Sequence, residues 1–206
     1  MRGEKRWELL LMRRPGGADF APGAYVFPGG TVHGEDSGSG DEIRMAAVRE
    51  LFEEVGILLA RSSRGFAVQD DCDSVREAVA GGATFNAALE GRNLEPAFDE
   101  LALFARWVTP SPMSRRYDAR FFFARCPERQ SVEPQEGEVT DWLWITPEQA
   151  LVDDRVTLVY ATRAVLESFA TNDAATDVIR RARAVGEVPI IEPRMVQTES
   201  GWTIEH

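Results

Sequence analysis

The sequence predicts an α/β fold in which short apolar strands alternate with helices. Short apolar segments that end at Pro, Gly or charged residues, such as 7–13 and 101–108, are typical of strands. The longer segment 41–55 places its apolar residues at helical spacing. With 206 residues, 44% of them hydrophobic and 28% charged, the chain has an ordinary globular composition and is long enough to bury a sizeable core.

The first elements are predicted to be two strands and an exposed loop. Residues 7–13 form an apolar run that ends before Pro-Gly-Gly at 15–17, which predicts a strand. Residues 24–27 form a second extended segment, and Pro-Gly-Gly at 28–30 stops it. The segment 34–40 consists of Gly, Ser and acidic residues, so we expect an exposed loop there.

A helix follows this loop and is predicted to run to about Val55. Asp41 or Ser39 can cap its first turn, because their side-chain oxygens accept hydrogen bonds from free backbone N–H groups. Gly56 is a suitable end, since glycine adopts the left-handed conformation that terminates many helices.

We expect one domain over 1–206, with 61–100 as a helical insertion and 151–206 as a C-terminal helical extension and tail. Thr-Pro-Glu at 146–148 is typical of a helix start, because proline is tolerated in the first turn. The other predicted elements are short helices at 74–80 and 85–89, strands at 101–108, 119–125 and 142–145, helices at 157–169 and 174–184, and an extended tail at 187–206.

Charge and hydropathy exclude several kinds of partner. The net charge of −11 would repel a long polyanion, so general nucleic-acid binding is not expected. No apolar run approaches the roughly 20 residues that a membrane-spanning helix needs. The charged start of the chain lacks the apolar core of a secretion signal. These features predict a soluble, cytoplasmic protein that does not bind membranes.

The rarity of histidine and cysteine narrows the chemistry. Cys72 and Cys126 lie far apart without neighbouring metal ligands, so neither a disulfide framework nor a zinc motif is indicated. Only His33 and His206 could serve a nucleophilic mechanism that needs an imidazole, and no Gly-x-Ser-x-Gly turn is present. A histidine in a glycine-rich loop such as His33 is more often simply exposed. Carboxylate and metal chemistry remains.

Three carboxylates gather on one face of the predicted helix 41–55. Glu50, Glu53 and Glu54 are related by i, i+3 and i+4, and the apolar side chains of that helix lie on the opposite face. Like charges at these spacings repel, and hard cations such as magnesium or manganese select oxygen-rich sites of this kind. Acidic triplets on helices are often just solvated faces. Two features favour a metal site. The glycines at 29–30 let backbone groups approach a metal or phosphate closely, and Arg49 is a cation beside the carboxylates.

The segment 49–57, Arg-Glu-Leu-Phe-Glu-Glu-Val-Gly-Ile, resembles the second half of the Nudix box, Gly-x5-Glu-x7-Arg-Glu-U-x-Glu-Glu-x-Gly-U with U aliphatic. In the first half, Gly29 and Glu35 have the expected spacing, whereas Gly30 is paired by the same spacing with Asp36. From either acid to Arg49 the gap exceeds seven residues, by six or five. Which acid occupies the first acidic position stays open.

The resemblance implies a Nudix-type α/β/α sandwich with a mixed sheet. It also implies that Glu50, Glu53 and Glu54 ligate Mg²⁺ or Mn²⁺, that Gly30 offers its backbone carbonyl, and that Arg49 orients the carboxylates. Glu50, Glu53 and Arg49 would form the catalytic set, with a glutamate accepting the proton of the attacking water. Nudix domains usually begin with a strand before the equivalent of 7–13, so an edge strand is either missing or supplied by another segment.

The implied activity is hydrolysis of a diphosphate linkage in a small nucleotide-like molecule. Segments 9–14, 104–110 and 115–123 resemble the branch of peroxisomal coenzyme A diphosphatases and their bacterial relatives, so coenzyme A or an acyl-coenzyme A is the leading substrate. A homodimer is a candidate assembly. The alternative is a Nudix-like ligand sensor or regulator without catalysis, although such proteins typically lose the box carboxylates that this chain keeps.

Residues outside the box supply further candidates. Glu136 and Glu138 precede the strand 142–145, where Nudix enzymes often place an additional carboxylate; the alternative is an acidic turn. A guanidinium matches the geometry of a phosphate, although most surface arginines are simply solvated. On this basis the candidates for substrate binding are Arg13, Arg14, Arg115 and Arg116.

Overall fold

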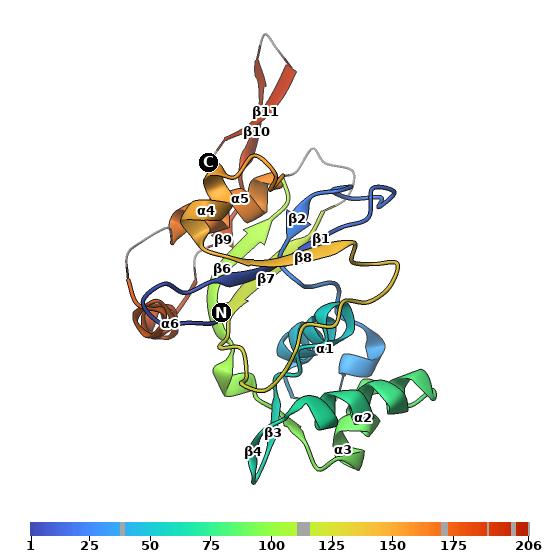
Figure 1. Cartoon of the computed structure of the whole chain (residues 1–206). Helices are drawn as coiled ribbons and strands as arrows, with labels where there is room; N and C mark the ends of the chain where they lie inside the picture. Colours follow the sequence, from blue (N-terminus) through green and yellow to red (C-terminus); the bar gives the residue numbers. More distant parts are fainter. Residues whose placement is uncertain (38–39, 111–115, 170–172, 189, 199–200, 206) are drawn as a thin grey trace.

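Short strands and helices alternate along the chain, as Figure 1 shows. The computed structural model describes residues 1–37, 40–110, 116–169, 173–188, 190–198 and 201–205. The helices of these residues are α1 (Glu42–Val55), α2 (Gln69–Ala80), α3 (Phe85–Gly91), α4 (Pro147–Val152), α5 (Tyr160–Ser168) and α6 (Ala175–Ala184). The strands are β1 (Leu9–Arg13), β2 (Tyr25–Val26), β3 (Ala60–Ser62), β4 (Gly65–Phe66), β5 (Glu95–Pro96), β6 (Ala102–Val108), β7 (Asp118–Phe123), β8 (Asp141–Ile145), β9 (Ile190–Ile191), β10 (Arg194–Thr198) and β11 (Gly201–Glu205).

β1 is the central strand of an antiparallel sheet with the order β2-β1-β8. Side chains alternate across a strand, so β1 contributes to two apolar clusters. Leu10 and Met12 pack with Val55, at the end of α1, whereas Leu11 packs with α5 and α6 on the other side. The sheet therefore lies between α1 and the C-terminal helices, which is the predicted α/β/α layering (Figure 1).

A second sheet has the order β7-β6-β9, with β6 and β7 antiparallel and β6 and β9 parallel. This mixed pairing agrees with the prediction of a mixed sheet. Within the expected extended tail over 187–206, Ile190 and Ile191 supply the edge strand β9 beside β6, and β10 and β11 form a hairpin. A segment from late in the chain therefore completes one edge of the sheet.

The helix α1 begins and ends where the sequence predicts. The Asp41 carboxylate accepts a hydrogen bond from the Arg44 backbone N–H at 3.1 Å, so Asp41 is the residue that caps the first turn. Gly56 has φ 75° and its N–H donates to Phe52, which ends the helix in the left-handed conformation. The three glutamates consequently share one rigid element.

The predicted insertion contains the strands β3, β4 and β5 and the helices α2 and α3. α2 begins at Gln69, five residues before the predicted start at residue 74. The insertion packs on α1 through an apolar cluster that joins Phe52 to Phe85, and their ring centroids lie 5.7 Å apart. The insertion therefore covers the side of α1 that faces away from the sheet.

Among the described residues, none of the helices combines the length and the apolar composition needed to cross a bilayer.

Candidate active site

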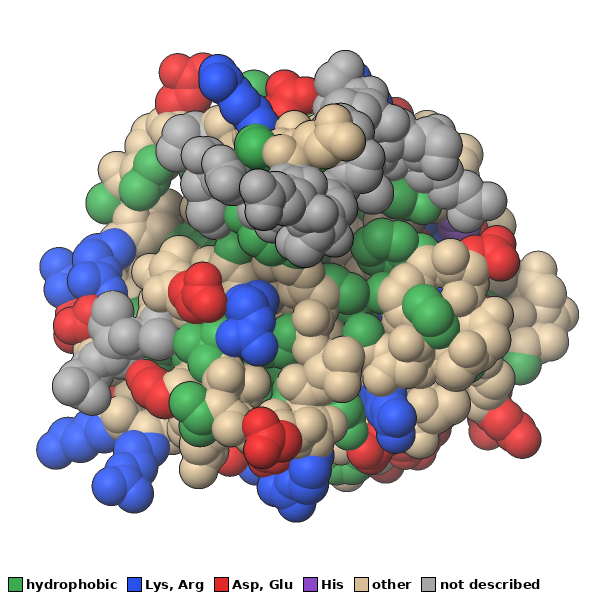
Figure 2. All heavy atoms as spheres, turned by 90° about the horizontal axis from the view of Figure 1, so that it is seen from above, with side chains coloured by type: hydrophobic (Ala, Val, Ile, Leu, Met, Phe, Trp, Pro, Cys, Tyr) green, Lys and Arg blue, Asp and Glu red, His purple; other side chains and the backbone are tan. Residues whose placement is uncertain are grey.

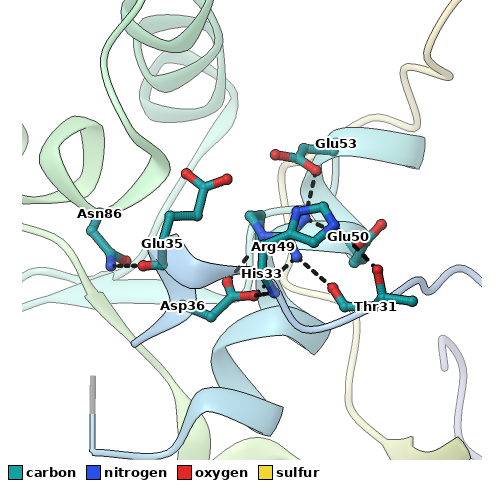
Figure 3. A network of polar contacts seen from close by, with 8 residues as sticks. All are labelled: Thr31, His33, Glu35, Asp36, Arg49, Glu50, Glu53 and Asn86. Carbon is teal, nitrogen blue, oxygen red and sulfur yellow. Dashed lines mark hydrogen bonds and ion pairs between the residues drawn. The ribbon is translucent and has the colours of Figure 1, made fainter. Parts of the chain in front are cut away.

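Arg49 is the centre of the polar network that Figure 3 shows, and its side chain is only 1% exposed. Its Nε and Nη2 donate to the two carboxylate oxygens of Asp36, each at 3.0 Å. Nη2 also donates to the backbone carbonyl of Thr31 at 2.9 Å. This forked pairing of a guanidinium with a carboxylate fixes the plane of the Arg49 head group.

The third nitrogen of Arg49 holds two of the box carboxylates. Nη1 donates to Glu50 at 3.0 Å and to Glu53 at 2.9 Å. Because both carboxylates bind the same nitrogen, their oxygens lie within two hydrogen-bond lengths of each other (Figure 3). Arg49 therefore contacts Glu50 and Glu53, two of the carboxylates that the resemblance implies it orients.

Glu54 lies deeper than the other two and has a different partner. The residue Glu54 is only 6% exposed, and its carboxylate accepts a hydrogen bond from the Gly29 backbone N–H at 2.7 Å. Burial raises the pKa of Glu54 to about 8, and the charges of Glu50 and Glu138 act in the same direction. The Gly29 N–H and the Arg14 guanidinium oppose this rise without cancelling it.

Gly30 lies directly against Glu50. A Cβ atom at this position would overlap the Glu50 carboxylate, so the backbone of the Gly-Gly segment comes closer to the glutamate than another residue would allow. The strand β2 therefore leads into a loop that brings Gly29 to Glu54 and Gly30 to Glu50.

The charges in the network shift the pKa values of its members. Burial alone would raise the pKa of Asp36, but the hydrogen bonds from Arg49 and from the His33 backbone outweigh it and lower the pKa below its ordinary value. Burial would lower the pKa of Arg49, and its carboxylate partners raise it instead. For Glu53, burial raises the pKa despite the ion pair with Arg49. Asp36 and Arg49 are therefore a tightly bound ionised pair.

The structure distinguishes the two acids of the loop. Asp36 is 1% exposed and binds Arg49, whereas the Glu35 side chain is exposed and its charge contributes to the raised pKa of Glu53. The Glu35 backbone carbonyl accepts a hydrogen bond from Asn86 at 2.9 Å. In Figure 3 dashed lines join Asp36 to Arg49, and none joins the Glu35 carboxylate to Arg49. Of the two acids, Asp36 is therefore the one whose side chain contacts Arg49.

The candidates outside the box fall into two groups. Glu138 is close enough to Glu54 to act on its pKa, whereas no interaction with the box carboxylates is found for Glu136, which is exposed. Arg116 binds the Thr109 carbonyl and the Glu192 carboxylate, away from the glutamates. Arg115 lies outside the described residues.

Arg13 and Arg14 have different neighbours. Arg14, the residue after β1, donates to the Phe20 carbonyl at 2.9 Å, and its charge opposes the rise in the pKa of Glu54. Arg13 donates to the Gly23 carbonyl and lines a hollow of about 690 Å³ with Tyr25 and Asp141, whose side chains are joined by a hydrogen bond of 2.5 Å. None of the box carboxylates lines this hollow.

Three contacts of the site are not visible in the sequence pattern. The Thr31 carbonyl binds Arg49, the Gly29 N–H binds Glu54, and Asn86 of α3 holds the loop at Glu35. Backbone groups carry no sequence signature, although the Gly-Gly pair indicated a close approach. Asn86 comes from the insertion, 51 residues away, and only the fold brings it to the loop.

The donors of this site suit a hard divalent cation. Within the part of the chain that the structure describes, no three acidic, His or Cys side chains are close enough to ligate one ion: two glutamates are turned to Arg49 and the third to Gly29. All three nevertheless offer carboxylate oxygens around one loop, and burial, together with the charges of Glu50 and Glu138, raises the pKa of Glu54. The carboxylate oxygens that these residues offer are the kind of ligand that Mg²⁺ or Mn²⁺ binds.

Comparisons with known proteins agree with this geometry. Residues 39–160, more than half of the chain, match the family described as NUDT19 Nudix domain. The chain is 30% identical over 154 residues to a putative nudix hydrolase 7 of Caenorhabditis elegans, covering 74% of this chain and 51% of that protein. It is 25% identical to the acyl-coenzyme A diphosphatase NUDT19 of Xenopus laevis, over 71% of this chain and 54% of the relative.

A solved structure has the same fold. The crystal structure of a NUDIX hydrolase from Alicyclobacillus acidocaldarius superposes with a TM-score of 0.69 and 25% identity, and the match covers 84% of this chain and 87% of that one. This chain spans about half the length of the two curated relatives above. By its fold, its carboxylate network and the match over residues 39–160, the chain belongs to the NUDT19 Nudix domain family of Nudix hydrolases.

Proposed function

We propose that this protein is a metal-dependent hydrolase that cleaves a diphosphate linkage in a nucleotide-like small molecule. The observation that carries the proposal is the arrangement of Glu50 and Glu53 on one nitrogen of a buried Arg49, with Glu54 beside them on Gly29. A purely structural acidic face would be solvated, whereas here Glu54 is buried, and burial raises its pKa.

Each residue has a defined part in this proposal. Glu50, Glu53 and Glu54, with the Gly30 carbonyl, would hold Mg²⁺ or Mn²⁺, which when bound polarises the diphosphate and lowers the pKa of water. Arg49 keeps Glu50 and Glu53 oriented, and Asp36 keeps Arg49 in place. A glutamate of this set accepts the proton of the attacking water.

Glu53 suits the role of proton acceptor. It is the most exposed of the three glutamates, with 34% of its side-chain surface accessible, so water can reach it. Burial raises its pKa above the ordinary value, which moves it towards the range in which a carboxylate is an effective base. Arg49 limits this rise and holds the acceptor oxygen in position.

Coenzyme A or an acyl-coenzyme A is the proposed substrate. The support is the similarity to the frog acyl-coenzyme A diphosphatase and the family match. Its diphosphate carries two negative charges that a cation and Arg14, whose charge acts on Glu54, would complement.

The test is a substrate panel with the purified protein. Coenzyme A, acyl-coenzyme A, ADP-ribose, NADH and nucleoside triphosphates are incubated with Mg²⁺ or Mn²⁺, and phosphorus-containing products are separated and identified. We expect hydrolysis at the diphosphate of coenzyme A or its acyl forms, lost when a chelator removes the cation. Ligand binding without turnover of any panel member would contradict the proposal and favour a non-catalytic sensor.

A further inference from the structure

The hollow of about 690 Å³ beside β8 lies on the face of the sheet opposite to α1. Arg13 comes two residues after Leu11 in β1, and side chains alternate along a strand, so both face the side on which Leu11 packs with α5 and α6. Tyr25 and Asp141 are the partners of Arg13 in β2 and β8, so these three residues form one row across the sheet. The hollow is therefore separate from the glutamates of α1, none of which lines it.

This hollow has an apolar floor and a charged rim. Tyr25, Ile145 and Val156 are the buried part of its lining, whereas Arg13 and Asp141 are exposed. In Figure 1 α4 lies above β8, on the side of the molecule that Figure 2 views from above, and that view shows hydrophobic side chains among acidic and basic ones. A concave apolar surface with a few polar groups is typical of a site for a small molecule.

Arg13 and Asp141 carry opposite charges on neighbouring strands and are held apart. Within the described part of the chain, neither forms an ion pair, although they are partners in the sheet. The Arg13 Nε donates to the Gly23 carbonyl at 3.1 Å, on the β2 side of β1. The Asp141 carboxylate, on the β8 side, accepts from the Tyr25 hydroxyl at 2.5 Å and from the Trp142 backbone N–H at 2.8 Å. All these partners are neutral, so one positive and one negative charge lack a counter-ion at the rim.

The other polar groups of the hollow have partners of their own. Asp153 and Arg155 form an ion pair at 2.6 Å. Burial and the hydrogen bond to Asp141 raise the pKa of Tyr25 to about 12, so its hydroxyl stays protonated at neutral pH. An anionic ligand would complement Arg13 alone, and a cationic one Asp141 alone. Only a ligand with both charges complements both residues.

We propose that this hollow binds a small zwitterion with an apolar side chain, of the class of the aliphatic amino acids. The two Nη groups of Arg13 donate to its carboxylate, since a guanidinium pairs with a carboxylate through parallel N–H donors. Asp141 accepts from its ammonium group through the remaining lone pairs of the carboxylate. The apolar side chain covers Ile145 and Val156. This site goes beyond the proposed hydrolase function and does not depend on it.

The experiment uses three ligands that differ by one charged group. Leucine carries both charges, isocaproate lacks the ammonium group and isoamylamine lacks the carboxylate. Each is titrated into the isotope-labelled whole protein, and the amide chemical shifts of Trp144 and Ile145, which line the hollow, report binding there. We expect leucine to bind about tenfold more tightly than either analogue, because each analogue loses one charge-assisted contact.

Two variants separate the two charges. In Arg13→Gln the affinity for leucine should fall to that for isoamylamine, whose own affinity stays unchanged. In Asp141→Asn the affinity for leucine should fall to that for isocaproate, which is likewise unchanged. Arg180→Gln is the matched control, because Arg180 lies on α6 with 71% of its side chain exposed and does not line the hollow. It should keep all three affinities, and circular dichroism with thermal melting shows whether each variant is folded.

Several results would overturn the inference. One is equal affinity of the wild type for leucine and both analogues, and another is a leucine affinity that survives in folded Arg13→Gln and Asp141→Asn proteins. Inorganic phosphate that binds more tightly than leucine, and only when Arg13 is present, would show a plain anion site instead. Glycine should bind about tenfold more weakly than leucine, because it covers none of the apolar floor, and equal binding of the two would also contradict the proposal.

Discussion

Arg49 combines two tasks that only a guanidinium can combine. Two of its nitrogens face Asp36 and the third faces Glu50 and Glu53, so one planar group couples a buried carboxylate to two glutamates of the site. A lysine ammonium is a point charge and could not hold the three partners in fixed directions. The position of the glutamates therefore depends on a residue that they themselves do not contact, namely Asp36.

Asp36→Asn tests this dependence. The substitution removes the charge that faces buried Arg49, so we expect a loss of about 2–4 kcal/mol in the free energy of unfolding. Turnover with Mg²⁺ should also fall, by roughly tenfold or more, because Arg49 is no longer fixed against Glu50 and Glu53. Urea denaturation and steady-state kinetics measure the two effects.

Glu35→Gln is the control for this variant, since Glu35 is the neighbouring acid and its side chain is exposed. We expect stability close to that of the wild type, and the comparison uses the free energy of unfolding because the charge of Glu35 also acts on the pKa of Glu53. Equal losses in the two variants would show that Asp36 is not the acid that serves Arg49.

Glu54→Gln separates activity from stability. Glutamine keeps the size of the side chain and resembles the protonated carboxyl that burial and the neighbouring Glu50 favour, since the pKa of Glu54 is about 8. We therefore expect a protein at least as stable as the wild type without added metal, with turnover reduced about a hundredfold or more.

The exposed Glu136→Gln variant should match the wild type in both measurements, which are thermal melting and product formation. A Glu54→Gln protein that still turns over at the wild-type rate would refute the assignment of Glu54 to the site. A folded but inactive Glu54→Gln protein would support it.

The sequence predicts some of these residue positions and leaves others open for a physical reason. The i, i+3, i+4 spacing is local, so the shared face of Glu50, Glu53 and Glu54 follows from helical geometry. The choice between Glu35 and Asp36 depends on the path of a lengthened loop, which packing against α3 determines through Asn86. No spacing rule contains that contact.

Among the elements, those with local end signals are the best predicted. α1 has Asp41 at its start and Gly56 at its end, and both signals act within one turn. α2 starts earlier than predicted because its first turn is capped from inside: the Asp71 carboxylate accepts the Val68 N–H, and valine is not a common capping residue. β9 has two residues and exists through its pairing with β6, so its own sequence could not reveal it.

Asp71→Asn tests the coupling of the two insertion helices. Asp71 binds the Val68 N–H at 3.1 Å and Arg92, after α3, at 3.0 Å. Burial alone would raise the pKa of Asp71, but these two partners lower it below its ordinary value of 3.8. We expect the variant to lose about 1–2 kcal/mol of unfolding free energy at pH 7, measured by urea denaturation.

The loss should depend on pH in one direction. Because the folded protein lowers this pKa, the stability that ionised Asp71 contributes is present above the unfolded pKa and disappears as pH falls through the folded value. The difference between wild type and variant should therefore shrink in acid. Asp70→Asn, at the exposed neighbouring position, should change stability little at any pH; a pH-independent loss in Asp71→Asn would indicate altered packing instead.

At the scale of the whole molecule, the site lies where three parts of the chain meet. The loop after β2 supplies Gly29 and Gly30, α1 supplies the glutamates, and α3 of the insertion holds the loop. Apolar patterning predicted the alternating strands and helices, and the resemblance to the Nudix box implied the α/β/α layers, in which both faces of a central strand are covered. It could not predict how the insertion packs on α1, since that contact joins residues far apart in the sequence.

This arrangement predicts that a bound divalent cation stabilises the entire fold. A ligand that binds only the folded state adds about 2.7 kcal/mol at a concentration of one hundred times its Kd. For a chain of this length that corresponds to a rise of roughly 5–10 °C in Tm. Calorimetric melting with and without Mg²⁺ or Mn²⁺ measures the rise.

Two comparisons separate specific binding from screening of the net charge of −11. Sodium chloride at the same ionic strength should give only a small part of the rise, because it weakens repulsion without occupying the site. Glu54→Gln should likewise lose most of the rise, whereas Glu136→Gln should keep it. If sodium chloride or the Glu54→Gln variant reproduced the full rise, the cation would be acting on the acidic surface in general, and these glutamates would not be its ligands.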